Sequence, residues 1–244
     1  MLIPPETWTS PCGVAYRWFK DGRFEIDGAG FPQWDVAGGH GKQLVKLWAD
    51  WGVPIQAAAD KHGIPASWLV AIMKIETGGK PYVCSSAGAC GLMQFMPIAC
   101  KMYGHSDCSY YNTHLDEQIM DAADLLVVKK AGIESKGCIL SGVKRYNGGS
   151  PCGQSKGINV TTPGLLNMWG ENNYVEGFVR AANTFVALGL APAAPLSIGG
   201  TTPVMLQGIV VAGILGVVAY MFADLQWSLT DRIAASLGID RWNA

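Results

Sequence analysis

The stretch that decides the fold runs from Glu76 to Pro97 and reads ETGGKPYVCSSAGACGLMQFMP. An apolar segment, WLVAIMKI at 68–75, precedes it, and a second apolar segment within it carries one amide, Gln94. On a helix, Glu76 shares a face with the apolar residues seven, four and three positions earlier, Leu69, Ile72 and Met73. Burial on that face disfavours the charged form, so we expect a raised pKa for this carboxyl. The stretch therefore predicts a helix that ends at a general acid.

The same stretch resembles the soluble lytic transglycosylase and goose-type lysozyme superfamily, whose enzymes cut the glycan strands of peptidoglycan. Glu76, Ser85, the run GACGLMQ at 88–94 and Met96-Pro97 align with its first motif without a gap. Three later motifs keep the family order, at His114–Ile119, Tyr146–Gly149 and Asn173–Val175. The resemblance covers residues 54–188 and implies a lysozyme-like, mainly α-helical catalytic domain.

The resemblance also implies a mechanism with one acid. Glu76 would protonate the β-1,4 oxygen between MurNAc and GlcNAc and then take the proton of the substrate's C6 hydroxyl, forming 1,6-anhydroMurNAc. Ser85, Gln94 and Tyr146 would line the sugar site, Met96 would supply an apolar wall, Asn147 would brace the loop that carries Tyr146, and Tyr174 would orient Glu76. For each polar residue the alternative is a buried hydrogen bond without a catalytic share. Thr77 stands where the family usually has serine, and we expect little loss from the extra methyl.

Other activities remain open. Many glycosidases use two carboxylates, yet no Asp or Glu other than Glu76 lies between Asp60 and Asp107. A goose-type hydrolase, in which Asp107 or Asp116 would position a water, is the alternative enzyme. A non-catalytic binding protein is disfavoured, because a buried acid without a function is costly. A membrane-perforating device with the wall domain as its guide is the fourth possibility.

Composition restricts the partners. The chain has 244 residues and a formal net charge of −1, which argues against nucleic acid. Its seven cysteines favour a disulfide-permitting compartment. Two pairs, Cys84 with Cys90 and Cys138 with Cys152, bracket loops of the predicted site. A zinc site would tolerate the spacing of Cys100, His105, Cys108 and His114, but we favour disulfides and free thiols, and expect no metal and no cofactor.

The chain before the catalytic domain predicts a β-hairpin. Asp21-Gly22 is a strong turn signal between the β-like segments 14–20 and 23–26. The hairpin carries four aromatic residues, Tyr16, Trp18, Phe19 and Phe24. They could stack on sugars, but we favour packing of these rings against the main domain. Gly38–Gly41 indicates a hinge. We therefore predict an N-terminal extension over 1–42 and a helical transglycosylase domain over 43–188.

The C-terminal part predicts a membrane anchor. A Pro/Gly-rich linker at 189–203 leads to 204–222, nineteen residues without a charge, which is long enough for a transmembrane helix; a buried helix is the alternative. Basic residues in the tail 223–244, Arg232 and Arg241, place the C-terminus in the cytoplasm and the enzyme on the peptidoglycan side. The N-terminus lacks signal-peptide features. We therefore expect a phage virion component that opens the wall locally for genome entry, with a secretion-system enzyme as the alternative.

Overall fold

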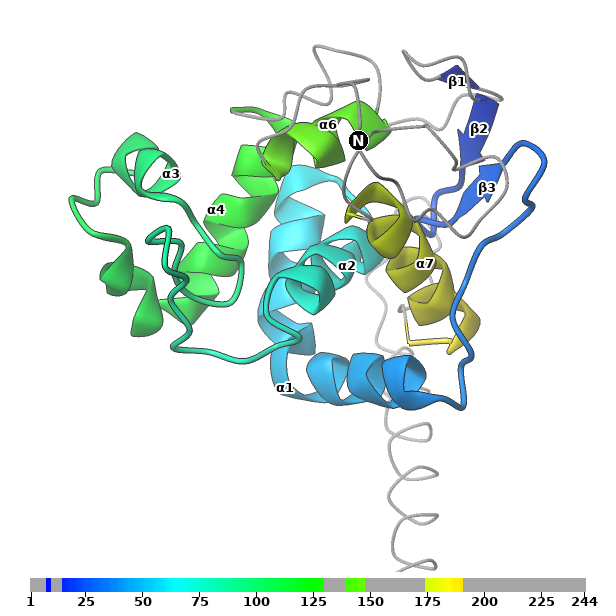
Figure 1. Cartoon of the computed structure of the whole chain (residues 1–244), viewed down its shortest axis with the longest axis horizontal. Coiled ribbons are helices and arrows are strands. Elements are labelled where there is room, and N and C mark those ends of the chain that lie inside the picture. Colours follow the sequence, from blue (N-terminus) through cyan, green and yellow to red (C-terminus); the bar gives the residue numbers. More distant parts are fainter. Residues whose placement is uncertain (1–7, 10–14, 130–138, 148–173, 191–244) are drawn as a thin grey trace, which may run out of the picture. The chain divides into compact units, whose positions relative to one another are not determined.

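The computed structural model describes residues 8–9, 15–129, 139–147 and 174–190, all within the unit Met1–Ala194. These residues form helices and one small antiparallel sheet (Figure 1). The elements are β1 Trp8–Thr9, β2 Ala15–Trp18, β3 Phe24–Ile26, α1 Gly39–His62, α2 Ala66–Glu76, α3 Pro97–Met102, the 3₁₀ helix η1 Cys108–Asn112, α4 Leu115–Val127, α6 Ile139–Tyr146 and α7 Tyr174–Ala187. The prediction of a mainly α-helical fold is confirmed.

The predicted membrane anchor, 204–222, lies outside the described residues, as do the tail and most of the linker. None of the helices in the described ranges combines the length and apolar character that crossing a membrane requires. The anchor therefore stays a prediction.

The predicted hairpin is present and packs on the helical core. β2 and β3 pair antiparallel, with Trp18 opposite Phe24, and the backbone N–H of Gly22 closes the turn by donating to Phe19 O at 2.8 Å. The inward side chains are buried, and the rings of Trp18 and Phe24 lie 5.3 and 5.8 Å from that of Trp68 in α2. Packing on the domain, rather than stacking on sugars, is thus the role of these two rings.

The predicted hinge at Gly38–Gly41 is wrong, because α1 already begins at Gly39. Gly41 is buried in the first turn, where a Cβ atom would lie 1.9 Å from the carbonyl oxygen of Val36. Gly41 therefore allows a close approach of two backbone segments. α1 is bent (Figure 1), and it contains Pro54, which removes an interior hydrogen bond of the helix.

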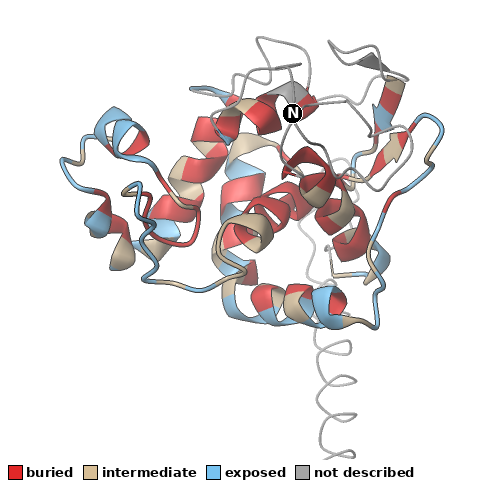
Figure 2. Ribbon diagram, in the orientation of Figure 1, coloured by how far each residue is buried: buried red, intermediate tan, exposed pale blue. Residues whose placement is uncertain are grey.

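α2 is the central helix of the described fold. Its residues 66–73 are all buried, and α1, α4 and α7 contact it, which explains why it is apolar all round (Figure 2). The helix ends where the sequence predicted, because the backbone N–H groups of Thr77 and Gly78 both donate to Met73 O, at 3.1 and 3.0 Å. Glu76 therefore lies at the C-terminal end of a buried helix.

α4, α6 and α7 complete the core around α2. They lie within the range 43–188, for which the sequence predicted a helical domain. α3 and η1 lie in a more exposed segment, 77–114, that has little regular structure (Figure 2). Two disulfides stabilise this segment, Cys84–Cys90 and Cys100–Cys108.

Candidate active site

Glu76 and Tyr174 meet although 98 residues separate them in the sequence. The Tyr174 hydroxyl donates a hydrogen bond to Oε1 of Glu76 at 2.7 Å. Glu76 ends α2 and Tyr174 begins α7, and these two helices pack against each other. The contact between the two residues is the one that the orienting role of Tyr174 requires.

The environment of Glu76 suits an acid that works near neutral pH. Burial raises the pKa of Glu76 to about 7, and the hydrogen bond from Tyr174 opposes this rise. The residue nevertheless keeps intermediate exposure, so its carboxyl is desolvated and still accessible. Among the described residues no second carboxylate influences this pKa.

A second buried carboxyl, Glu176, lies two residues after Tyr174 on α7. The guanidinium of Arg180 donates to its Oε1 at 2.8 Å and also donates to the carbonyl oxygen of Gln33 at 3.0 Å. Arg180 thus joins α7 to the segment before α1, while its ion pair with Glu176 lies within α7. Glu176 is therefore occupied in a structural contact.

Tyr146 lies beside the acid and fixes the neighbouring loop. Its buried hydroxyl donates to the carbonyl oxygen of Met93 at 3.1 Å. Burial raises the pKa of Tyr146, and the nearby charge of Glu76 adds to this rise. The pKa of Tyr174 is raised by burial first, with further contributions from Glu76 and Tyr146. Glu76, Tyr146 and Tyr174 thus lie near enough for the charge of Glu76 to affect the pKa of both tyrosines.

Gln94 braces the loop that we call the site loop, residues 83–96. Its side-chain amide donates to the carbonyl oxygens of Val83 and Gly91, each at 2.9 Å. Its backbone φ is +48°, a conformation that non-glycine residues rarely adopt and that is common at functional sites. The structure thus gives Gln94 a structural contact, and its contact with sugar stays a prediction.

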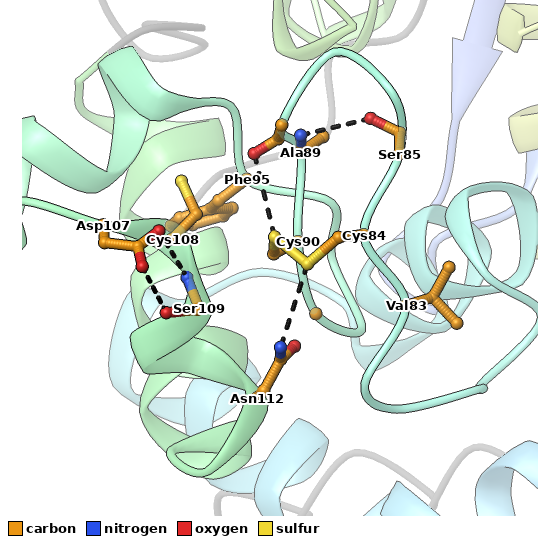
Figure 3. Close-up of a disulfide and its surroundings, with 12 residues drawn as sticks. Val83, Cys84, Ser85, Ala89, Cys90, Phe95, Asp107, Cys108, Ser109 and Asn112 are labelled. Carbon is orange, nitrogen blue, oxygen red and sulfur yellow. Dashed lines mark hydrogen bonds between the residues drawn. A yellow bond between two sulfur atoms is a disulfide. The ribbon is translucent and has the colours of Figure 1, made fainter.

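Ser85 lies in the part of the site loop that the Cys84–Cys90 disulfide closes (Figure 3). Its hydroxyl oxygen accepts a hydrogen bond from the backbone N–H of Ala89 at 3.1 Å, and its own N–H donates to Ala89 O at 2.8 Å. Ser85 itself is exposed. The neighbouring disulfide is contacted by the side-chain amide of Asn112, which lies 3.8 Å from Cys84 Sγ. The local contacts of Ser85 close this turn, so its role toward substrate stays a prediction.

Met96 and Asn147 lie at the ends of helices. Met96 is 40% exposed and precedes α3, so an apolar side chain faces solvent after the site loop. Asn147 is exposed and directly follows α6. The loop that it was predicted to brace begins at Gly148, outside the described residues. Both roles stay predictions.

Two side chains join the site loop to the core. The Thr77 hydroxyl donates to Leu92 O at 2.9 Å, which agrees with a requirement for a hydroxyl after the acid. The buried amide of Gln118 in α4 donates to Cys90 O at 2.7 Å and accepts from the Met93 N–H at 3.2 Å. Sequence reasoning did not give Gln118 this role. Its signal was an amide four positions before Ala122 and seven before Leu125, on the apolar face of the predicted helix.

The cysteines follow the interpretation that we favoured. Cys84–Cys90 is one of the two predicted disulfides, while the other predicted pair, Cys138 and Cys152, lies outside the described residues. Cys100 pairs with Cys108, so neither thiol is available for the four-residue zinc site that the spacing would tolerate. Cys84–Cys90 lies within the site loop, and Cys100–Cys108 joins α3 to η1.

A comparison with family models matches residues 53–120 to the family described as Transglycosylase SLT domain. No curated protein matches the chain. The matched range contains the second half of α1, Glu76, the whole site loop and the first turns of α4, whereas Tyr146 and Tyr174 lie after it. Residues 53–120 are thus similar to the Transglycosylase SLT domain, and this match supports the resemblance to the lytic transglycosylase and lysozyme-like superfamily.

Proposed function

We propose that this protein is a peptidoglycan lytic transglycosylase that cleaves the β-1,4 bond between MurNAc and GlcNAc and leaves a 1,6-anhydroMurNAc end. The observation that carries the proposal is the state of Glu76, a desolvated carboxyl held by a tyrosine, with no second carboxylate acting on its pKa among the described residues. In a two-carboxylate glycosidase a second carboxyl lies near the acid and supplies the nucleophile or activates the water.

The single carboxyl acts twice in this mechanism. First Glu76, protonated, donates its proton to the bridging oxygen as the bond to C1 of MurNAc breaks, so GlcNAc leaves with a hydroxyl. The resulting carboxylate then accepts the proton of the C6 hydroxyl of the same MurNAc, whose oxygen bonds to C1. Glu76 regains its proton, and no water is consumed. A pKa of about 7 allows both steps, because neither protonation state is strongly disfavoured near neutral pH.

The remaining site residues have supporting roles in the proposal. Tyr174 holds the carboxyl in one orientation and stabilises its charged form between the two steps. Ser85, Gln94, Met96 and Tyr146 line the sugar site, and Asn147 supports Tyr146. The braces of the site loop, above all Gln118, keep this surface in place.

The products provide the direct test. We expect muropeptides released from purified sacculi to carry anhydro ends, each about 20 Da lighter than the hydrated and then reduced products of a hydrolase (roughly water plus two hydrogens). Mass spectrometry of the released fragments measures this difference. Reducing MurNAc ends as the main product would instead establish the goose-type hydrolase, with Asp107 or Asp116 as the residue that positions water. Asp107 already accepts hydrogen bonds from the backbone and hydroxyl of Ser109 (Figure 3), which argues against it.

The pH profile tests the roles of Glu76 and Tyr174 together. Because the first step needs the protonated acid, kcat/KM should fall as the pH rises above about 7. The Tyr174 hydroxyl stabilises the carboxylate, so Tyr174→Phe should raise the pKa of Glu76 and move this falling limb to higher pH. A purely structural Tyr174 would lower activity without moving the limb. Tyr103→Phe is the control, because that hydroxyl bonds to Asp121 O and Asp124 Oδ2 instead.

The cellular setting is part of the proposal. The enzyme acts on the peptidoglycan side of the envelope, anchored through residues 204–222, and a phage virion delivers it for genome entry; a secretion system is the alternative. The uncharged segment 204–222 and the basic residues after it support the anchor. The two disulfides support an oxidising compartment. Other virion proteins would be its partners, together with the lipid membrane.

Liposome flotation tests the anchor. We expect the full chain to float with vesicles, and a chain that ends at Ala194 to remain in the aqueous fraction while it still releases muropeptides. The reason is that 204–222 offers enough apolar length to span a bilayer. A full chain that stays in the aqueous fraction would contradict the anchor and leave the enzyme assignment untouched.

A further inference from the structure

Outside the candidate active site, three side chains with metal-binding atoms converge from two elements. His105 lies in the segment between α3 and η1, and Glu117 and Asp121 lie one turn apart on α4. One ligand atom from each residue lies within 4.8 Å of the other two. The closest measured pair is His105 Nε2 and Glu117 Oε1, at 3.5 Å. The mechanism above uses none of these residues.

Aromatic neighbours hold all three side chains in place. The Tyr110 hydroxyl donates to Glu117 Oε2 at 2.8 Å, and the Tyr111 hydroxyl donates to Asp121 Oδ2 at 2.6 Å. The ring of His105 stacks on that of Tyr110, with centroids 3.8 Å apart and planes 15° apart. Carboxylates that bind metals are typically held by a hydrogen bond to one oxygen, while the other oxygen stays free to bind the ion.

The nitrogen that faces this cluster lacks a hydrogen bond. His105 Nε2 is buried and has no hydrogen-bond partner among the described residues. Its 3.5 Å separation from Glu117 Oε1 is too long for a well-formed hydrogen bond. Buried polar atoms without a partner are rare, and an ion that is not in the structure is one accepted explanation. The two carboxylates also repel each other at i and i+4 on α4 unless a cation lies near them.

We propose that His105, Glu117 and Asp121 bind a divalent metal ion, with Zn²⁺ as the best fit. One imidazole nitrogen with two carboxylate oxygens is a borderline ligand set that suits Zn²⁺ better than Mg²⁺ or Ca²⁺, which prefer oxygen alone. Zinc lies about 2.0–2.2 Å from such atoms, so the widest pair must approach by roughly 1 Å. Glu117, with 45% of its side chain exposed, has room to make this movement.

The site differs from the four-residue zinc site that the spacing of cysteines and histidines would tolerate. Cys100 and Cys108 form a disulfide, and His114 stacks on Tyr110 at 3.8 Å, with its Nδ1 2.9 Å from Tyr110 O. Two rings stacked in parallel on one tyrosine occupy its two faces, so His105 and His114 are separated by the Tyr110 ring. Only one of the two histidines therefore faces the carboxylates.

The ion would join the segment after α3 to α4. Glu117 directly precedes Gln118, the residue that braces the site loop, so the ion would stiffen the same helix that supports the site. Its role would be structural, because none of its ligands contacts Glu76 in the described residues. An ion that binds only the folded state raises the melting temperature, and the rise grows with the metal concentration.

The test uses the oxidised full chain, stripped with a chelator and kept free of reductant so that the Cys100–Cys108 disulfide persists. We expect titration calorimetry with Zn²⁺ to give one site per chain, with a rise in Tm on saturation. His105→Gln, Glu117→Gln and Asp121→Asn should each weaken binding at least tenfold, since even outer-shell changes have effects of that size. His114→Gln is the matched control and should bind as the wild type does.

Co²⁺ provides a second readout that does not depend on stability. Its visible absorption should report a nitrogen and oxygen environment in the wild type, and the band should disappear in Glu117→Gln, an exposed change that leaves the core intact. No stoichiometric Zn²⁺ binding, or equal binding by His105→Gln and the wild type, would overturn the proposal. The cluster would then be a contact between His105 and Glu117 without a metal ion. Loss of binding in His114→Gln alone would overturn it as well.

Discussion

Glu76→Gln should lower the rate of peptidoglycan cleavage by ~10²-fold or more while the fold persists. The amide keeps the shape of the side chain and accepts the hydrogen bond from the Tyr174 hydroxyl, but it cannot donate and recover a proton at neutral pH. The measurement is the release of soluble muropeptides from sacculi by equal amounts of the two proteins. Cleavage by the variant at close to the wild-type rate would show that the acid lies elsewhere.

The same substitution should change stability in a pH-dependent way. Burial raises the pKa of Glu76 in the folded protein from 4.5 to about 7. The stability contributed by the protonated carboxyl is therefore complete below pH 4.5, and it is lost as the pH rises through about 7. The loss is on the order of 3 kcal/mol above that range, at about 1.4 kcal/mol for each pKa unit. Because Gln does not titrate, denaturant unfolding should show Glu76→Gln gaining stability relative to the wild type between pH 4 and pH 8.

Asp50→Asn is the matched control for this experiment, since Asp50 is an exposed carboxyl on α1 whose ion pair is with the exposed Lys46. It should leave both activity and the pH dependence of unfolding near those of the wild type. If Glu76→Gln were inactive but its free energy of unfolding depended on pH as that of the wild type does, the Glu76 carboxyl would not be desolvated. An inactive and more stable variant would show that the site keeps an unfavourable buried acid for its function.

The elements that the sequence predicted depend on local signals. α2 follows from an apolar stretch between Pro65 and the Gly78-Gly79 pair, and the hairpin follows from Asp21-Gly22 between two aromatic segments. Glu76 and Tyr174 could be assigned to one site only through the family motifs, because the contact spans 98 residues and no local pattern specifies it.

The features that the sequence did not reveal depend on tertiary contacts. Gly38–Gly41 indicates a hinge when only local flexibility is considered, whereas in the fold Gly41 is required by the nearby backbone of Val36. The pairing of Cys100 with Cys108 depends on the path of the chain between α3 and η1. Gln118 could be recognised as an amide on an apolar face, but the loop that it braces could not be named without the structure.

Gln118→Leu should produce the second large effect, a loss of about 2–6 kcal/mol in the free energy of unfolding. Leucine has a similar volume, but the buried carbonyl of Cys90 and the N–H of Met93 would each lose their hydrogen-bond partner, at about 1–3 kcal/mol apiece. Urea unfolding at fixed pH measures this change. Gln56→Leu on α1 is the matched control, because its amide donates to Asp60 in an exposed contact, and it should stay within about 0.5 kcal/mol of the wild type.

The same variant should also lose activity at temperatures where it remains folded. Met93 O accepts the hydrogen bond of Tyr146, so a displaced site loop would move the tyrosine that lies beside Glu76. The loop also packs closely on this amide, because Gly91 adopts φ +78° and a Cβ atom there would lie 2.3 Å from Gln118 Oε1. Gln118→Leu with wild-type stability and turnover would contradict the brace. Loss of turnover in a folded Gln118→Leu would show that catalysis depends on a helix that carries no catalytic residue.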